Sequence, residues 1–179
     1  DLKLPGVQAE LIRAVAATGT PVVVVLVSGR PYSLTWEAEH VQGICAAWLP
    51  AEEGGSAVAD VLFGKVTPGG KLPISFPRAV GQVPVYYAHK PSGGRSQWTG
   101  NYVDSSASPL YPFGYGLSYT TFHYEHLKID QPTIPQDGSV TIGLEIENAG
   151  KCAGDEVVQP YVHYQPVQAV ITRPVKELK

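Results

Sequence analysis

The feature that most constrains this sequence is a change of pattern at residues 109–122. Before this stretch, helix-like segments alternate with apolar runs, whereas after it the pattern is typical of strands. Pro109 and Pro112 exclude a regular helix here, and Gly114 and Gly116 permit backbone conformations that other residues avoid. The stretch also carries five aromatic residues, which a polar linker does not need. We therefore expect it to pack between two bodies and to fix the angle between them.

Composition argues against several classes of protein. Only 16% of the 179 residues are charged and the formal net charge is −3, which favours neither nucleic-acid binding nor disorder. The longest purely apolar run, residues 22–27, is far too short to span a membrane. Cys45 and Cys152 do not form the spacing of a disulfide framework or a zinc site, so we expect two unpaired and mostly buried thiols. Isolated cysteines favour a cytoplasmic location. A periplasmic location stays open because, although Asp1 begins no visible signal peptide, a removed one leaves no trace.

Two helices are predicted before the change of pattern. The first covers residues 5–18, because Pro5 suits the first turn of a helix and Gly19 supplies a stop. Its apolar stripe consists of Val7, Leu11, Ile12 and Val15. The second is an amphipathic helix over residues 56–64, after a loop at 50–55. Its inward side chains are expected to be Val58, Val61 and Leu62.

Strands are predicted between these helices. Residues 21–27 are β-branched and continuously apolar, which is typical of a strand covered on both faces in a parallel sheet. A second short apolar run covers 43–49, and the mixed pattern at 36–42 indicates no element. Helices that alternate with buried strands predict an α/β fold. We assign residues 1–84 to the second half of a doubly wound, mostly parallel sheet sandwich.

A long polar segment without periodicity follows at residues 85–108. Loops of this length inside a compact protein are usually functional, and this one combines side chains that bind sugars by stacking and hydrogen bonding. The candidates for substrate contact are His89, Arg95, Trp98 and Asp104. An ordered loop that covers a seam between domains is the alternative. Residues 85–122 are therefore treated as a long loop followed by an aromatic junction.

The remaining residues, 123–179, predict an all-β domain. Strands are expected over 123–129, 139–148 and 156–163, with polar and apolar residues alternating most clearly in the second. An immunoglobulin-like sandwich needs about 100 residues and seven strands. We therefore expect only the start of such a domain, truncated within the sequence at hand.

No complete catalytic or metal-binding set emerges from the residues alone. His123 and His126 are three apart, so a regular strand directs them to opposite faces and they cannot share a metal ion. Ser28 follows a strand but lacks the glycines of a nucleophile elbow. Glu52 and Glu53 are adjacent, and neighbours in sequence rarely lie on either side of a glycosidic bond. The sequence predicts neither a metal nor a cofactor.

A series of motifs runs through the whole chain in order. They are LPGVQAELI (4–12), SGRP (28–31), WLPAEEGGSAVADVLFG (48–64), PGGKLPISFP (68–77), PFGYGLSYT (112–120), AGDEVVQ (153–159) and RPVKELK (173–179). Together they resemble glycoside hydrolase family 3, in particular its bacterial β-glucosidases. Ala51 departs from the glycine that is more usual there. The resemblance implies the end of the family's α/β sandwich followed by the start of its fibronectin-III-like domain.

The resemblance also implies what lies outside this chain. Family members are retaining enzymes in which an aspartate on an N-terminal barrel attacks the anomeric carbon and a glutamate acts as acid and base. That glutamate would precede Asp1, so no catalytic residue is assigned here. The expected partners are a β-glucoside or short β-glucan and the barrel portion, in the same or another chain, but no nucleic acid or membrane. The alternatives are a β-xylosidase or N-acetylglucosaminidase of the same family, and a non-catalytic carbohydrate-binding or scaffolding module.

Overall fold

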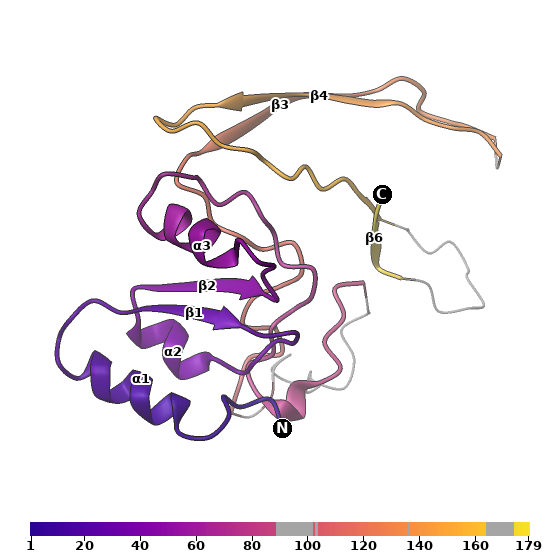
Figure 1. Cartoon of the computed structure of the whole chain (residues 1–179). Helices are drawn as coiled ribbons and strands as arrows, with labels where there is room; N and C mark the ends of the chain where they lie inside the picture. Colours follow the sequence, from indigo (N-terminus) through magenta and orange to yellow (C-terminus); the bar gives the residue numbers. More distant parts are fainter. Residues whose placement is uncertain (89–101, 103, 136, 164–173) are drawn as a thin grey trace. The chain divides into compact units, whose positions relative to one another are not determined.

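The structure, a computed structural model, has mixed α/β architecture with small sheets (Figure 1). It describes residues 1–88, 102, 104–135, 137–163 and 174–179. The first compact unit comprises Asp1–Val58, Lys71–Gly116 and Val158–Lys179, and the second comprises Ala59–Gly70 and Leu117–Val157. Within the described ranges, no helix is long and apolar enough to cross a bilayer.

A parallel strand pair forms the centre of the first unit. β1 (Val23–Val27) pairs with β2 (Gly43–Trp48), and Figure 1 shows the two strands pointing in the same direction. Helix α1 (Gln8–Ala16) precedes β1, α2 (Thr35–His40) lies in the connection between the strands, and α3 (Gly54–Leu62) follows β2. The predicted alternation of helices and strands is therefore confirmed, with ends shifted by a few residues.

The core of the first unit is small and centred on three buried side chains, Leu26, Leu34 and Phe76. The Phe76 ring meets the rings of Trp48 and Tyr111 edge-on, at centroid distances of 6.1 and 6.3 Å. Main-chain bonds reinforce this packing, because the Phe76 amide donates to the Tyr111 carbonyl at 2.8 Å. Burial and the neighbouring Tyr115 raise the pKa of Tyr111. The first part of the aromatic stretch thus packs against the core of this unit.

Three details of the first unit differ from the sequence predictions. Helix α2 was missed, because six residues are too few to show a helical period. Val7, Leu11 and Val15 of the α1 stripe are exposed, and only Ile12 of that stripe is half-buried. Finally, Val23 and Val27 are exposed, so the prediction that β1 is covered on both faces is wrong at its two ends.

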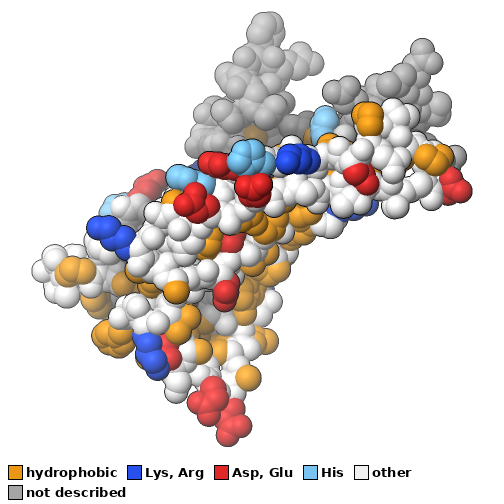
Figure 2. Space-filling model, turned by 90° about the horizontal axis from the view of Figure 1, so that it is seen from above, with side chains coloured by type: hydrophobic (Ala, Val, Ile, Leu, Met, Phe, Trp, Pro, Cys, Tyr) orange, Lys and Arg blue, Asp and Glu red, His pale blue; other side chains and the backbone are white. Residues whose placement is uncertain are grey.

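The second unit is built on an antiparallel ribbon of β3 (Phe122–Ile129) and β4 (Ile142–Asn148). Segment 59–70 belongs to the same unit and is hydrogen-bonded to residues that flank the ribbon. The Tyr119 hydroxyl donates to the Val61 carbonyl at 2.9 Å, and the Thr67 hydroxyl donates to the Ala153 carbonyl at 2.7 Å. Figure 2 shows acidic, histidine and basic side chains gathered along one face of the ribbon.

A bulge in β3 overturns the expected placement of two histidines. The register shifts between Glu125 and Lys128, and His126 adopts a φ of 53°. His123 lies opposite Glu147, on the face that also carries Glu145. The bulge turns His126 to the same face, where its Nδ1 lies 3.0 Å from Glu145 Oε2. The prediction of opposite faces is wrong because an extra residue resets the alternation.

The last predicted strand is also shorter than expected. Strand structure is confined to β5 (Tyr161–His163), which pairs antiparallel with β6 (Lys176–Leu178) within the first unit. Residues 156–160 form no strand in the structure. Pro160 has no amide hydrogen to donate to a ladder, which accounts for the position of the strand start.

Candidate functional site

The predicted substrate loop begins at a cluster of aromatic rings. Tyr87 stacks on Phe113 with a centroid distance of 4.3 Å and an interplanar angle of 16°. The Tyr87 hydroxyl accepts a hydrogen bond from the Leu178 amide at 3.3 Å, and the Ala88 carbonyl accepts one from the Val175 amide at 2.8 Å. The start of the loop is therefore tied to the C-terminal segment of the same unit.

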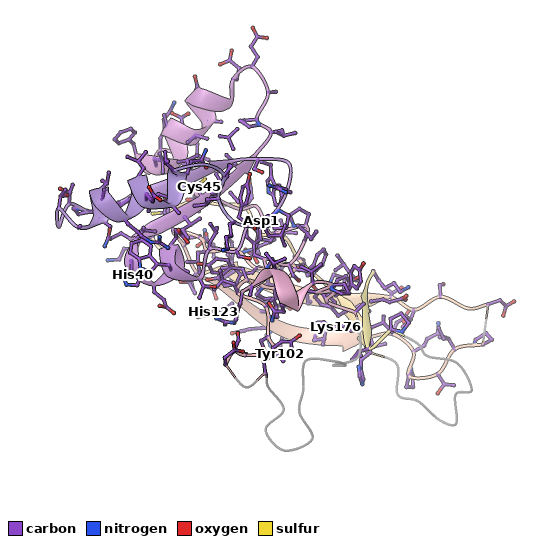
Figure 3. The ribbon with its side chains drawn as sticks, turned by 90° about the horizontal axis from the view of Figure 1, so that it is seen from below. Asp1, His40, Cys45, Tyr102, His123 and Lys176 are labelled. Atoms are coloured by element: carbon purple, nitrogen blue, oxygen red, sulfur yellow. The ribbon has the colours of Figure 1, made fainter. Side chains whose placement is uncertain are left out.

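Tyr161 extends this cluster. Its hydroxyl donates to Gln159 Oε1 at 2.8 Å, while Gln159 Nε2 donates to the Gly114 carbonyl at 3.0 Å. The Lys176 ammonium, labelled in Figure 3, lies 4.7 Å from the centroid of the Tyr161 ring, within the range of a cation–π contact. Burial, followed by the neighbouring Tyr87, raises the pKa of Tyr161. Gly114 has a φ of 79°, and a Cβ there would collide with the Gln159 amide oxygen.

The end of the loop is held by Gln82, at the end of a short 3₁₀ helix (Val80–Gln82). Gln82 is only 8% exposed. Its Nε2 donates to the carbonyls of Ser106, Ala107 and Ser108 at 3.2, 3.1 and 3.0 Å. Its Oε1 accepts from the Arg78 amide at 2.8 Å, and Arg78 Nε donates to the Ser108 carbonyl at 3.0 Å. Both ends of the loop are therefore fastened to the first unit.

Only one of the predicted substrate-contact residues falls within the described part of the chain. His89, Arg95 and Trp98 lie outside the described residues, and Asp104 is exposed near the anchored end of the loop. Tyr86, which the sequence pattern did not single out, is 69% exposed and directly precedes the half-buried Tyr87. An exposed ring at the start of the loop offers a surface on which a sugar can stack. Its signal in the sequence is the Tyr86–Tyr87 pair.

The other candidates form no reactive arrangement in the described part of the chain. Glu52 and Glu53 are exposed neighbours in the turn before α3. The Ser28 hydroxyl donates to the Arg30 carbonyl at 3.2 Å, and no described histidine or carboxylate contacts it. Among the described residues, no group of three or more His, Cys, Asp and Glu side chains is placed to hold a metal ion. Cys45 and Cys152 are both free thiols, as predicted, but the expectation that they are buried is wrong for Cys152, which is exposed, and Cys45 is only half-buried.

Comparison with known proteins shows to which family this chain belongs. Residues 1–119 match the family model described as the glycosyl hydrolase family 3 C-terminal domain. This chain belongs to that family, and the resemblance inferred from the motifs is confirmed.

Several relatives are similar along nearly the whole chain. The periplasmic β-glucosidase of Salmonella typhimurium is 48% identical over 100% of this chain and 24% of the relative. A β-xylosidase of Formosa agariphila is 51% identical over 90% of this chain and 22% of the relative. Among solved structures, a β-glucosidase from Erythrobacter marinus has a TM-score of 0.88 at 43% identity, covering 99% of this chain and 23% of its own. The chain thus spans about a quarter of the length of these relatives.

Proposed function

We propose that this chain is the C-terminal portion of a retaining β-glucosidase that releases terminal non-reducing β-D-glucosyl residues. The observation that carries the proposal is the 48% identity to a named β-glucosidase over the full length of the chain. The solved β-glucosidase of Listeria innocua in complex with glucose supports it, with a TM-score of 0.84 at 38% identity over 99% of this chain. The substrate is a β-glucoside or a short β-glucan.

In this proposal the catalytic carboxylates lie outside the chain. The nucleophile belongs to an N-terminal barrel portion and the acid/base glutamate to the segment before Asp1, as the family resemblance implies. The coverage of about a quarter of each relative supports a large missing portion. Residues 1–84 would complete a doubly wound α/β sandwich, 85–122 would form the loop and junction, and 123–179 would begin a fibronectin-III-like sandwich. The parallel β1–β2 pair supports the first assignment and the antiparallel β3–β4 ribbon the last.

The loop at 85–108 is proposed to contact the sugar. His89, Arg95 and Asp104 would donate or accept hydrogen bonds and Trp98 would stack on the ring. The support is indirect but physical: both ends of the loop are held by stacked rings and buried hydrogen bonds, and Tyr86 is exposed at its start. A loop fastened in this way can hold contacts at fixed positions beside a substrate.

A β-xylosidase is the second candidate, because the relative from Formosa agariphila with that name is 51% identical over 90% of this chain. The substrates of the two activities differ by one hydroxymethyl group, which the glucosyl ring carries and the xylosyl ring lacks.

The deciding experiment measures hydrolysis of 4-nitrophenyl β-D-glucoside and 4-nitrophenyl β-D-xyloside. Three samples are compared: this chain alone, this chain mixed with the preceding N-terminal portion, and the full-length polypeptide. We expect no activity from the chain alone, activity from the full-length protein, and faster cleavage of the glucoside. Activity from the 179 residues alone would overturn the assignment of the carboxylates, whereas inactivity of the full-length protein on both substrates would refute the proposed function.

A further inference from the structure

The carboxyl ends of β1 and β2 lie at the same edge of the first unit, because the strands are parallel. Both ends are distorted. The register shifts between Leu26 and Val27, and Trp48 adopts a φ of 55°, which is rare for a bulky side chain. The Ser28 amide donates to the Trp48 carbonyl at 2.8 Å, so the loop after β1 remains fastened to β2. In open α/β sheets, ligands bind outside the carboxyl ends of the strands.

Arg30 projects from this loop and binds the main chain at the start of the sequence. Its Nη1 donates to the Asp1 carbonyl at 3.1 Å; Asp1 is labelled in Figure 3. The guanidinium carbon lies 5.2 Å from the centroid of the Tyr32 ring. The Ser28 hydroxyl donates to the Arg30 carbonyl at 3.2 Å and accepts from its amide at 3.3 Å. Both the side chain and the main chain of Arg30 are therefore held.

A second contact ties the same segment to the same edge. The Ser33 amide donates to the Leu2 carbonyl at 2.8 Å, and Leu4 packs against the core of Leu26, Leu34 and Phe76. Hydrogen bonds from Ser28 and Arg30 lower the pKa of Tyr32, which agrees with a cationic group close to that phenol. Residues 1–4 are thus clamped along the carboxyl edge rather than left loose.

We propose that Arg30 is a positioning residue, which clamps the main chain at Asp1 so that the polypeptide arriving there is aimed at the ligand side of the sheet. This inference rests on the proposed function, in which an N-terminal portion precedes Asp1. A guanidinium suits the task because its planar fork can stack on a ring and donate to a carbonyl at the same time. The ammonium of a lysine is a point charge and fixes the direction of a contact less well.

The test uses the full-length protein with Arg30→Met and Arg30→Lys. The matched control is Arg13→Met, because the Arg13 guanidinium carbon also lies 5.2 Å from an aromatic centroid, that of Trp36, and no described hydrogen bond joins it to residues 1–4. Displacing a group by about 1 Å can cost about 100-fold in rate. For Arg30→Met we expect kcat on 4-nitrophenyl β-D-glucoside to fall by at least ~10-fold while KM stays within about twofold. Arg30→Lys should recover part of the loss, and the control should stay within about twofold of the wild type.

A second readout does not depend on activity. Hydrogen–deuterium exchange of the peptide that contains residues 1–4 should become faster in Arg30→Met and remain unchanged in Arg13→Met. An unchanged kcat in Arg30→Met, or unchanged exchange at residues 1–4, would overturn the positioning role. If Arg30→Met fails to fold, kcat and the exchange rate at residues 1–4 are measured on Arg30→Lys instead, and these two readouts decide whether Arg30 has the positioning role. If the wild type cleaves neither sugar, the proposed function fails, and the exchange experiment still decides whether Arg30 clamps Asp1.

Discussion

Gln82→Ala tests the anchor at the end of the predicted substrate loop. The Gln82 amide oxygen accepts one hydrogen bond from Arg78, and its nitrogen lies within bonding distance of three carbonyls. Because an amide nitrogen carries only two hydrogens, these contacts amount to roughly three full bonds. At about 1 kcal/mol each, their loss should lower the free energy of unfolding by about 3 kcal/mol. For a chain of this size, that corresponds to a fall in Tm of roughly 6–12 °C.

Two comparisons make the experiment specific. Gln42→Ala is the matched control, because Gln42 is exposed and its side chain accepts a single bond, from the Val22 amide at 2.6 Å. We expect a loss below about 1 kcal/mol there. Gln82→Glu keeps the shape but places a carboxylate against three carbonyl oxygens, so it should destabilise at least as much as Gln82→Ala at neutral pH. Repulsion raises the folded-state pKa of that carboxyl, and stability should therefore recover as the pH falls and the group takes up a proton.

The assay is thermal unfolding of the four proteins side by side, followed by circular dichroism, with the Gln82→Glu variant repeated at acidic pH. A Gln82→Ala protein whose Tm lies within about 3 °C of the wild type would refute the reasoning. A Gln82→Glu protein as stable as the wild type at neutral pH would refute it as well, because the donor role of the amide nitrogen would then be unnecessary.

Two further predictions concern burial. Leu34→Ala should lower the free energy of unfolding by about 3 kcal/mol, because Leu34 is 0% exposed in the core. Leu49 is 75% exposed, so Leu49→Ala should change that free energy by less than about 0.5 kcal/mol in the same melts. Equal effects would mean that the core is not where we place it. Burial raises the pKa of the Cys45 thiol, so a disulfide reagent should modify the exposed Cys152 first. The rate of modification at Cys45 should keep rising at pH values where that of an ordinary thiol has levelled off. Mass spectrometry of the labelled peptides separates the two rates, and faster labelling of Cys45 would contradict this prediction.

The strands and longer helices of the first unit were predictable because their patterns are local. Continuous β-branched residues identified β1, and a helical apolar period identified α1. Periodicity indicates which side chains an element is able to bury, but it does not indicate whether another element is present to cover them. That is why Val7 and Val23 were expected inside and are exposed.

The second unit shows the limit of period-two reasoning. The strand predicted at 123–129 is present as β3, but the single extra residue of its bulge reverses every later assignment of side chains to faces. His126 adopts a φ of 53°, and although histidine is enriched among the non-glycine residues found in the left-handed region, such residues are too uncommon for its type alone to predict the bulge. Family motifs, by contrast, identified the family because they reflect shared ancestry, and no local physical rule supplies that information.

The side chains that hold main-chain segments in place were not predictable, and the reason is common to all of them. Gln82 binds the carbonyl of Ser108, Gln159 binds that of Gly114, Lys71 that of Gly116 at 3.1 Å, and Arg30 that of Asp1. In every case a polar side chain donates to a main-chain carbonyl that is distant in the sequence. Every residue type carries the same carbonyl, so the acceptor leaves no mark in a sequence pattern, and only the fold decides which one lies within reach. Side chains of this kind hold main-chain segments in place, which is the contribution that we expect of this chain if, as proposed, the catalytic carboxylates lie outside it.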